Sequence, residues 1–454
     1  MTKTMDMTKG NPTKLILAFA FPMLISTIFQ QLYGMIDTAI VGRGVGVSAL
    51  AAVGSTGSIT FLVIGFVSGL AYGFGILFSQ RFGASDYESL KQTFAQSILV
   101  GAALSAVITA LSIAGANALL KWMNTPDDIF SDASLYLITI FAAIPISLFY
   151  NLLSTALRSV GDSKTPLVAM IISSFVNITL DFLFVYAFKW GVFGVAIATV
   201  IAQGISCLIC LRGIVKCDAL KLRREHFRRD QPLAMQLLRL GLPVAFMNSI
   251  TAIGVMLLQS VVNGFGSLYV AGYTAADKLI IFLEQPGNTL GLAVGVYAGQ
   301  NLGANRMDRI RKGINAAIII SLILNASIGL LMYVGRDALV MIFLPAQDAT
   351  AVLPISGMLM KTMSLFMCPL GLLFIYRNTL QGMGDTRIPM ISGIVELVLR
   401  MSIALVFAPI WHFAAVCVAE VSAWVGAAIM LGIAYYIKCR KLENPRSLHP
   451  TNIT

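Results

Sequence analysis

The sequence predicts an all-α polytopic membrane protein: twelve transmembrane helices that form two homologous six-helix bundles around a central cavity. Three observations carry this prediction. Of the 454 residues, 57% are hydrophobic and only 12% are charged, whereas a soluble domain is about one quarter charged. Apolar runs that match the ~20 residues needed to cross a bilayer recur along the whole chain. The chain also contains an internal duplication, which assigns the helices to two sets.

Twelve apolar runs are long enough to be membrane-spanning helices. The longest polar stretch, residues 214–234, is a connection and is too short for a soluble domain. The alternating pattern of a transmembrane barrel is not found in the sequence. The predicted spans are residues 14–40, 52–79, 93–116, 133–157, 166–188, 192–213, 235–262, 270–299, 313–334, 352–376, 388–408 and 412–437.

Basic residues are distributed asymmetrically about these spans. Short cytoplasmic loops carry the excess of Lys and Arg, so both termini are predicted to be cytoplasmic and the protein to lie in the cell membrane. The same asymmetry explains the net charge of +11 without a nucleic-acid partner. The basic residues assigned to outer loops are only Arg43, Lys121, Lys189 and Arg336, and those assigned to span interiors are Lys278, Lys361 and Arg400.

The duplication emerges from three short matches at a nearly constant offset. "AFPMLIS" with Pro22 matches "GLPVAFM" with Pro243, "SQRFGA" at 79–84 matches "GQNLGA" at 299–304, and "GDSKTP" at 161–166 matches "GDTRIP" at 384–389. Three matches in the same order indicate two homologous halves. The predicted organisation is therefore an N-terminal bundle (residues 1–217), a basic connection (218–234) and a C-terminal bundle (235–454).

Six spans per half leave both halves in the same orientation, related by an axis along the membrane normal. Two such bundles can enclose a cavity that opens to either side in turn, which favours transport. Pro22 and Pro243 lie inside the first helix of each half, where a proline kinks the helix. Each is a candidate gating kink, and a static kink is the alternative.

Two carboxylates stand out in the first half. Asp37 and Asp181 are the only ionisable groups of spans 1–6 that lie away from the helix ends, and no Lys or Arg lies inside those spans to neutralise them. A charge within a membrane-spanning helix costs about 2.5–3.5 kcal/mol on insertion scales and usually marks a functional site. The pair therefore predicts a site for a mobile cation.

The topology places these groups at a similar depth. Asp37 lies six residues before Arg43, about 9 Å along a helix, and Asp181 lies eight residues before Lys189, about 12 Å. Thr199 in the returning span lies about 12–15 Å below the same surface. All three are expected to meet in the outer half of the bilayer.

Two further polar residues share these helix faces, since Tyr33 precedes Asp37 and Asn177 precedes Asp181 by one turn. Their oxygen acceptors suit a hard cation, or a proton shared by the two carboxyl groups. A structural cluster of protonated, hydrogen-bonded Asp residues is the alternative. The candidate coupling site is Tyr33, Asp37, Asn177, Asp181 and Thr199; as a Na⁺ site it would use Asp37, Asn177, Asp181 and Thr199.

The second half carries more intramembrane charge, with acids at positions 277, 284, 396 and 420 against the three bases named above. Glu396 and Arg400 are four residues apart and are expected to pair along one helix. Lys278, Glu284 and Glu396 are candidate substrate contacts in the central cavity. No cluster of metal ligands and no nucleophile with its base is found, so the protein is not predicted to be an enzyme and no cofactor is expected.

The motifs quoted above, together with "MIDTAIVG" around Asp37, "RSVGDSKTP" and "NITLDFLFVY" around Asp181, resemble those of the multidrug and toxic compound extrusion (MATE) transporters over essentially the whole chain. The resemblance implies export of cationic, often aromatic compounds against a gradient of H⁺ or Na⁺. It also implies a first-half cation site at the five positions from Tyr33 to Thr199. One departure is that span 7, residues 235–262, lacks the acidic cation ligand of some members.

The expected function is thus a secondary antiporter that works by alternating access, with H⁺ or Na⁺ as the coupling ion. The expected partners are organic cations or amphipathic drugs and membrane lipids, and the expected state is a monomer. A flippase for a lipid-linked or amphipathic precursor is the alternative. Such a flippase needs a strongly cationic cavity, which only Lys278, Lys361 and Arg400 could supply here.

Overall fold

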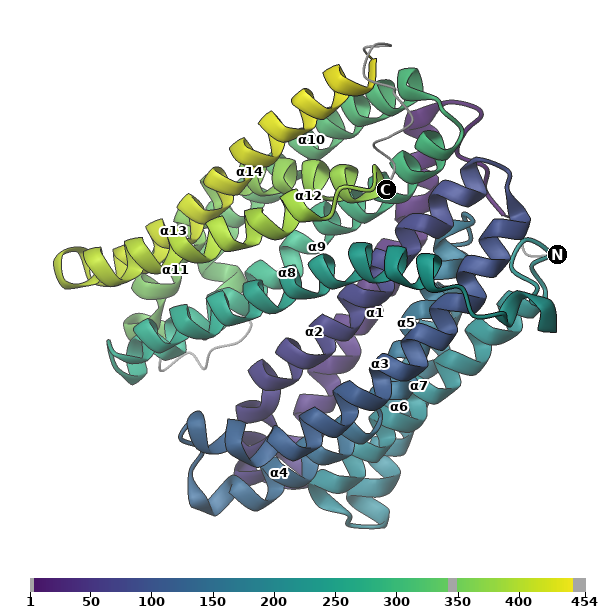
Figure 1. The fold of residues 1–454 in the computed structure, drawn as a ribbon. Coiled ribbons are helices and arrows are strands. Elements are labelled where there is room, and N and C mark those ends of the chain that lie inside the picture. Colours follow the sequence, from purple (N-terminus) through teal and green to yellow (C-terminus); the bar gives the residue numbers. More distant parts are fainter. Residues whose placement is uncertain (1–3, 342–348, 444–454) are drawn as a thin grey trace. The chain divides into compact units, whose positions relative to one another are not determined.

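A computed structural model describes residues 4–341 and 349–443. Within these residues every regular element is a helix (Figure 1). Ten helices are long and apolar enough to cross a membrane, and the number rises to twelve when each of two bent helix pairs is counted as one span. The predicted all-α fold of twelve spans is therefore confirmed.

The chain forms two compact units. Unit 1 contains the residues up to Asp6 and Phe21–Ser249, and unit 2 contains Met7–Ala20 and the described residues from Ile250 onward. The helices of unit 1 are α1 (Pro12–Gly44), α2 (Val47–Gly83), α3 (Tyr87–Trp122), α4 (Asp127–Ala142), α5 (Ile144–Ser159), α6 (Lys164–Phe182), α7 (Gly191–Val215) and α8 (Gln231–Asn263). Those of unit 2 are α9 (Ser267–Gly303), α10 (Met307–Val340), α11 (Ala349–Leu365), α12 (Met367–Gly382), α13 (Arg387–Trp411) and α14 (Phe413–Glu443).

Two helices are shared between the units. The part of α1 up to Ala20 belongs to unit 2, and the part of α8 up to Ser249 belongs to unit 1. The division in α1 falls next to Pro22, and both Pro22 and Pro243 lie inside unbroken helices. The bounds predicted from the sequence place residues 7–20 in the N-terminal bundle and residues 235–249 in the C-terminal bundle.

Two of the predicted spans are broken. Residues 133–157 and 352–376 were each expected to be one helix, but α4 meets α5 at 47° and α11 meets α12 at 55°. Each second helix has a proline in its first turn, Pro145 or Pro369. A proline cannot donate the helical hydrogen bond and its ring clashes with the preceding turn, so each first helix ends just before it.

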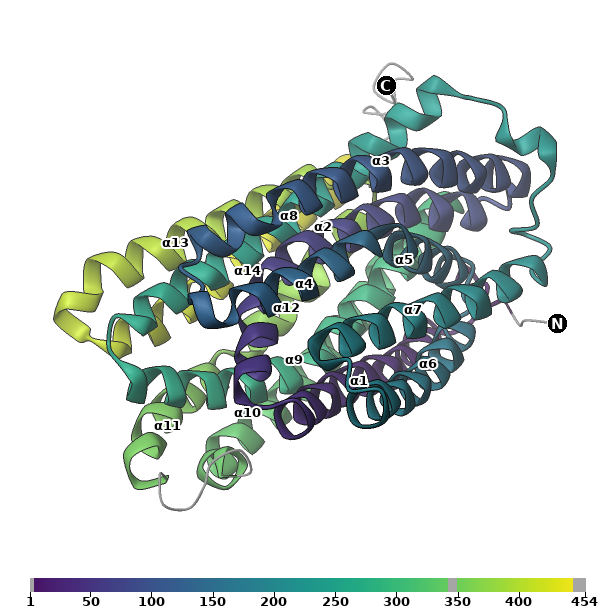
Figure 2. The same ribbon diagram turned by 90° about the horizontal axis from the view of Figure 1, so that it is seen from below.

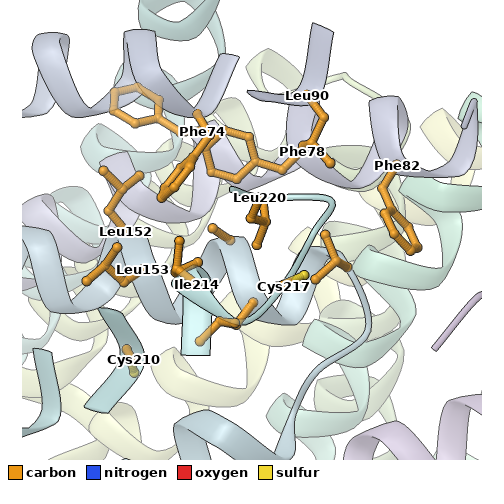
Figure 3. Close-up of a cluster of buried hydrophobic side chains, with 14 of the residues drawn as sticks. Phe74, Phe78, Phe82, Leu90, Leu152, Leu153, Cys210, Ile214, Cys217 and Leu220 are labelled. Atoms are coloured by element: carbon orange, nitrogen blue, oxygen red, sulfur yellow. The ribbon is translucent and has the colours of Figure 1, made fainter. Parts of the chain in front are cut away.

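Apolar side chains hold unit 1 together. Phe74 and Phe78 of α2 pack with α3, α5 and α7, and the rings of Phe78 and Phe94 meet edge to face with centroids 5.8 Å apart. Figure 3 shows that Cys217 and Leu220, which follow α7, lie in the same cluster. The start of the connection is thus anchored in the core of unit 1.

The duplicated "GD" turns have the predicted turn structure. Gly161 and Gly384 adopt left-handed φ angles of 86° and 81°. The Asp162 carboxylate accepts hydrogen bonds from the backbone N–H groups of Lys164 and Thr165 at 3.0 and 2.9 Å, and so caps α6. We call this end of each unit, where α2 and α9 finish and α6 and α13 begin, the inner end; it is the predicted cytoplasmic side.

Close packing of α9 on α12 requires glycine at 382. A Cβ atom added to Gly382 would lie 2.2 Å from the carbonyl oxygen of Gly295, so the helices must move apart. Gly382→Ala is expected to destabilise the protein by about 1–3 kcal/mol, measured by thermal unfolding in detergent. Gly204→Ala is the matched control, because nothing lies within 4 Å of that position and Ala favours a helix. Equal stability of both variants would contradict this packing.

Candidate functional site

Two buried residues of α6 form the centre of the predicted coupling site. Asp181 is 0% exposed and Asn177 is 1% exposed. Helix α6 packs along α7, which carries Thr199, and Figure 2 shows the two helices side by side. The long apolar sequence of both helices buries this face, so the carboxyl group is removed from water.

Three of the five predicted residues line one cavity within unit 1, and Asp37 and Asp181 are not among its lining residues. Tyr33 of α1, Asn177 of α6 and Thr199 of α7 line one cavity of about 100 Å³. Hydroxyl and amide groups line much of the remainder, including Ser147, whose Oγ donates a 2.5 Å hydrogen bond to Oε1 of Gln203. A cavity needs only roughly 10–15 Å³ per water molecule, so this one is large enough for a hydrated ion.

Asp37 and Asp181 lie close enough to interact electrostatically, and Tyr33 lies within the field of both. Neither oxygen of Asp181 and neither polar atom of the Asn177 amide has a hydrogen-bond partner, and Oδ1 of Asp37 has none. Among the described residues, no Lys or Arg forms an ion pair with either carboxyl group. Buried polar atoms are almost always paired, so this set of acceptors suits a transient positive ligand.

Sequence reasoning missed two features of this site. Tyr136 of α4 lies within the field of Tyr33, Asp37 and Asp181, but no spacing in the sequence relates it to them. A π-helical segment, Leu183–Ala187, begins two residues after Asp181. Such segments are rare and often occur at functional sites. Both features lie next to the pair of carboxyl groups.

The charges of unit 2 are arranged differently from the prediction. Glu396 does not pair with Arg400 along α13; it forms an ion pair with Arg377 of α12. Arg400 instead donates two hydrogen bonds to Glu420 of α14, at 2.5 and 3.1 Å. The expectation of a pair within one helix was wrong, because side chains on neighbouring helices offer closer, two-pronged geometry. Arg377 had been placed just outside the span that ended at 376.

Two acids of α9 remain outside these pairs. Asp277 and Glu284 are seven residues apart, on one face of the helix, and both lie within the field of Glu420. No ion pair joins either of them to a base in the described part of the chain. Lys278, which was proposed as a substrate contact together with Glu284 and Glu396, is exposed. Unit 2 thus combines two neutralised pairs with two acids that have no basic partner.

Comparison with known proteins identifies the family. The MatE family model matches twice, over residues 22–183 and 243–406, once in each half of the chain. The chain belongs to the MatE family. The offset between the starts of the two matches, Pro22 and Pro243, is the offset found within the sequence.

Relatives agree with this assignment. The chain is 31% identical to the probable multidrug resistance protein YoeA of Bacillus subtilis over 73% of each chain, and 30% identical to the probable multidrug resistance protein YpnP of the same organism over 68% of this chain and 69% of that one. A crystal structure of a MATE protein in complex with MaL6 has the same fold, with a TM-score of 0.91 at 24% identity, and covers 98% of this chain and 100% of that one. MatE proteins of this kind are multidrug efflux transporters and not enzymes.

Proposed function

We propose that this MatE protein exports cationic or aromatic compounds in exchange for H⁺ or Na⁺, and that the ion binds at Asp37 and Asp181. The observation that carries the proposal is the buried pair of carboxyl groups with unpartnered oxygens and no basic neighbour. A bound cation supplies the missing charge. In the described residues no three Asp, Glu, His or Cys side chains form a metal-type cluster, so neutral oxygens of Tyr33, Asn177 and Thr199 complete the site.

Export follows if ion and substrate favour different conformations. An ion that binds one arrangement of the two units more tightly shifts the population toward that arrangement. The same differential affinity then lowers the affinity for the drug, because coupling between two sites is reciprocal. In unit 2 we assign substrate contact to Glu284 and Lys278 in preference to Glu396, since Glu396 is engaged by Arg377.

The charges of unit 2 argue against a flippase for an anionic lipid-linked precursor. A flippase for an anionic lipid needs basic side chains in its cavity that no acidic side chain neutralises. Arg377 and Arg400 are both engaged by glutamates, and two further acids lie near Arg400. Asp277 and Glu284, which form no ion pair with a base among the described residues, suit a positively charged substrate.

Dye efflux from proteoliposomes tests the proposal. The protein is reconstituted, a pH or Na⁺ gradient is imposed, and transport of a cationic fluorescent dye is recorded. Asp37→Asn is expected to reduce gradient-driven transport by roughly 5–150-fold, the usual range of coupling between sites. Asp128→Asn is the control, because Asp128 is exposed at the start of α4. Efflux that is equally fast in both variants would reject the carboxyl pair as the coupling site.

A further inference from the structure

A cavity within unit 1 extends from the coupling residues toward the inner end. It is the cavity of about 100 Å³ that Tyr33, Asn177 and Thr199 line. On α6 the lining continues from Asn177 to Met170, and on α7 it continues from Thr199 to Ser206. The two ends of each stretch are seven residues apart, which is about 10 Å along a helix. Because α6 begins at the inner end and α7 runs back to it, the cavity extends inward from the level of the coupling residues.

The inward part of this cavity is lined by oxygen acceptors. Oγ of Ser173 and Oγ of Ser174 both donate to the carbonyl oxygen of Met170, at 3.0 and 2.8 Å. Oγ of Ser206 donates to the carbonyl oxygen of Ala169 at 3.3 Å. A hydroxyl group has only one hydrogen to donate, so each of these oxygens can act only as an acceptor toward the cavity. Among the described residues that line the cavity, none is charged.

Asn177 connects the carboxyl pair with these serines along one face of α6. Asp181, Asn177 and Ser173 follow one another at intervals of four residues, so they share a face of the helix. The Asn177 side chain is 1% exposed, and neither of its polar atoms has a hydrogen-bond partner. Buried polar atoms are almost always paired. An unpaired acceptor between two sets of oxygens suits a cation that moves from one set to the other.

The duplication shows that the fold does not require these small polar residues. The two GD turns lie 223 residues apart in the sequence, and α6 and α13 follow them directly. At this offset Ser173 corresponds to Glu396, and Asn177 corresponds to Arg400. Both of these unit 2 side chains are engaged in ion pairs. Unit 2 therefore has paired charges at the positions where unit 1 has neutral side chains that line a cavity.

We propose that the inward part of this cavity is a second station for the coupling cation, which the ion occupies with its water after it leaves the carboxyl pair. The oxygens of Ser173, Ser174 and Ser206 replace part of the water around a small monovalent cation. A cavity of about 100 Å³ leaves room for the ion and several water molecules. The inference rests on the ion-coupled export proposed above, and it names the next position of the ion inside unit 1.

Silver ions test the station, because Ag⁺ is a monovalent cation that binds to thiols and protects them from later alkylation. In the full-length protein with its six native cysteines replaced by alanine, Ser206→Cys places a thiol in the cavity. Leu208→Cys is the matched control, because Leu208 lies two residues further along α7, is 65% exposed and does not line the cavity. In liposomes, Ser206→Cys is expected to bind Ag⁺ at least about tenfold faster than Leu208→Cys, because a charged reagent is strongly disfavoured at a side chain that faces lipid.

Dye efflux in the same liposomes shows whether the station lies on the route of the ion. Bound Ag⁺ is expected to stop efflux by Ser206→Cys, because a cation then stays in the station, and to leave efflux by Leu208→Cys and by the cysteine-free protein unchanged. Ser173→Cys repeats the test from α6. The station is overturned if both cavity thiols bind Ag⁺ no faster than Leu208→Cys, or if they bind it and efflux continues. Dye efflux that survives Asp37→Asn would instead reject the coupling site, and it would not alter the Ag⁺ result.

Discussion

Asp181→Asn is expected to reduce gradient-driven efflux at least tenfold and at the same time to make the purified protein more stable to heat. Asp181 is fully buried, and both of its oxygens lack partners. A buried charge without a partner carries a large desolvation cost. Asparagine keeps the shape of the side chain and removes the charge, so the folded state should be more stable while the ion loses its ligand. Thermal unfolding in detergent and dye efflux in liposomes measure the two effects.

Asp162→Asn is the matched control for the stability effect. Asp162 is also buried in unit 1, at 5% exposure, but its carboxylate accepts hydrogen bonds from two backbone N–H groups and from the Thr165 hydroxyl. Loss of that charge weakens satisfied bonds, so this variant should be less stable than the wild type. If Asp181→Asn is destabilised in the same way as Asp162→Asn, the Asp181 carboxyl is a structural group and the coupling site is misassigned.

The sequence was enough to predict the spans and the duplication, and it also predicted that Asp37 and Asp181 lie at a similar depth. A long apolar run can only be buried or cross the membrane, and the distance of a residue from a charged loop fixes its depth along a helix. Asp37 and Asp181 could therefore be related through Arg43 and Lys189, although 144 residues separate them. Their proximity needed no knowledge of side-chain packing.

Features that depend on contact between helices could not be predicted in this way. Residue spacing in a sequence can indicate an ion pair only within one helix, so Glu396 was expected to pair with Arg400. The actual partners, Arg377 for Glu396 and Glu420 for Arg400, lie on neighbouring helices and were missed. Hydropathy also cannot show that a helix such as α1 changes from one unit to the other at Ala20. The wrong ion pair arises because tertiary contacts compete with local ones.

Arg400→Met is expected to destabilise the protein by about 3–5 kcal/mol, the usual cost of breaking a buried ion pair. Arg400 is 2% exposed and binds Glu420 through two hydrogen bonds, and it also lies within the field of Glu396 and Glu284. Its removal leaves acids in a buried region with one fewer compensating charge. Chemical or thermal unfolding of the purified protein measures the loss.

The double variant Arg400→Met with Glu420→Gln tests what the ion pair contributes to stability. Either the charged pair itself is required, or it is enough that neither charge is left buried without its partner. Replacing both partners of a buried pair is often nearly neutral, so most of the lost stability should return. Arg306→Met is the control in the same unit, because its pair with Asp308 is about half exposed and such surface pairs contribute little to stability. A double variant that is no more stable than Arg400→Met would show that Arg400 stabilises unit 2 through Glu396 or Glu284. If the double variant folds but no longer exports dye, the pair has a role in transport beyond stability.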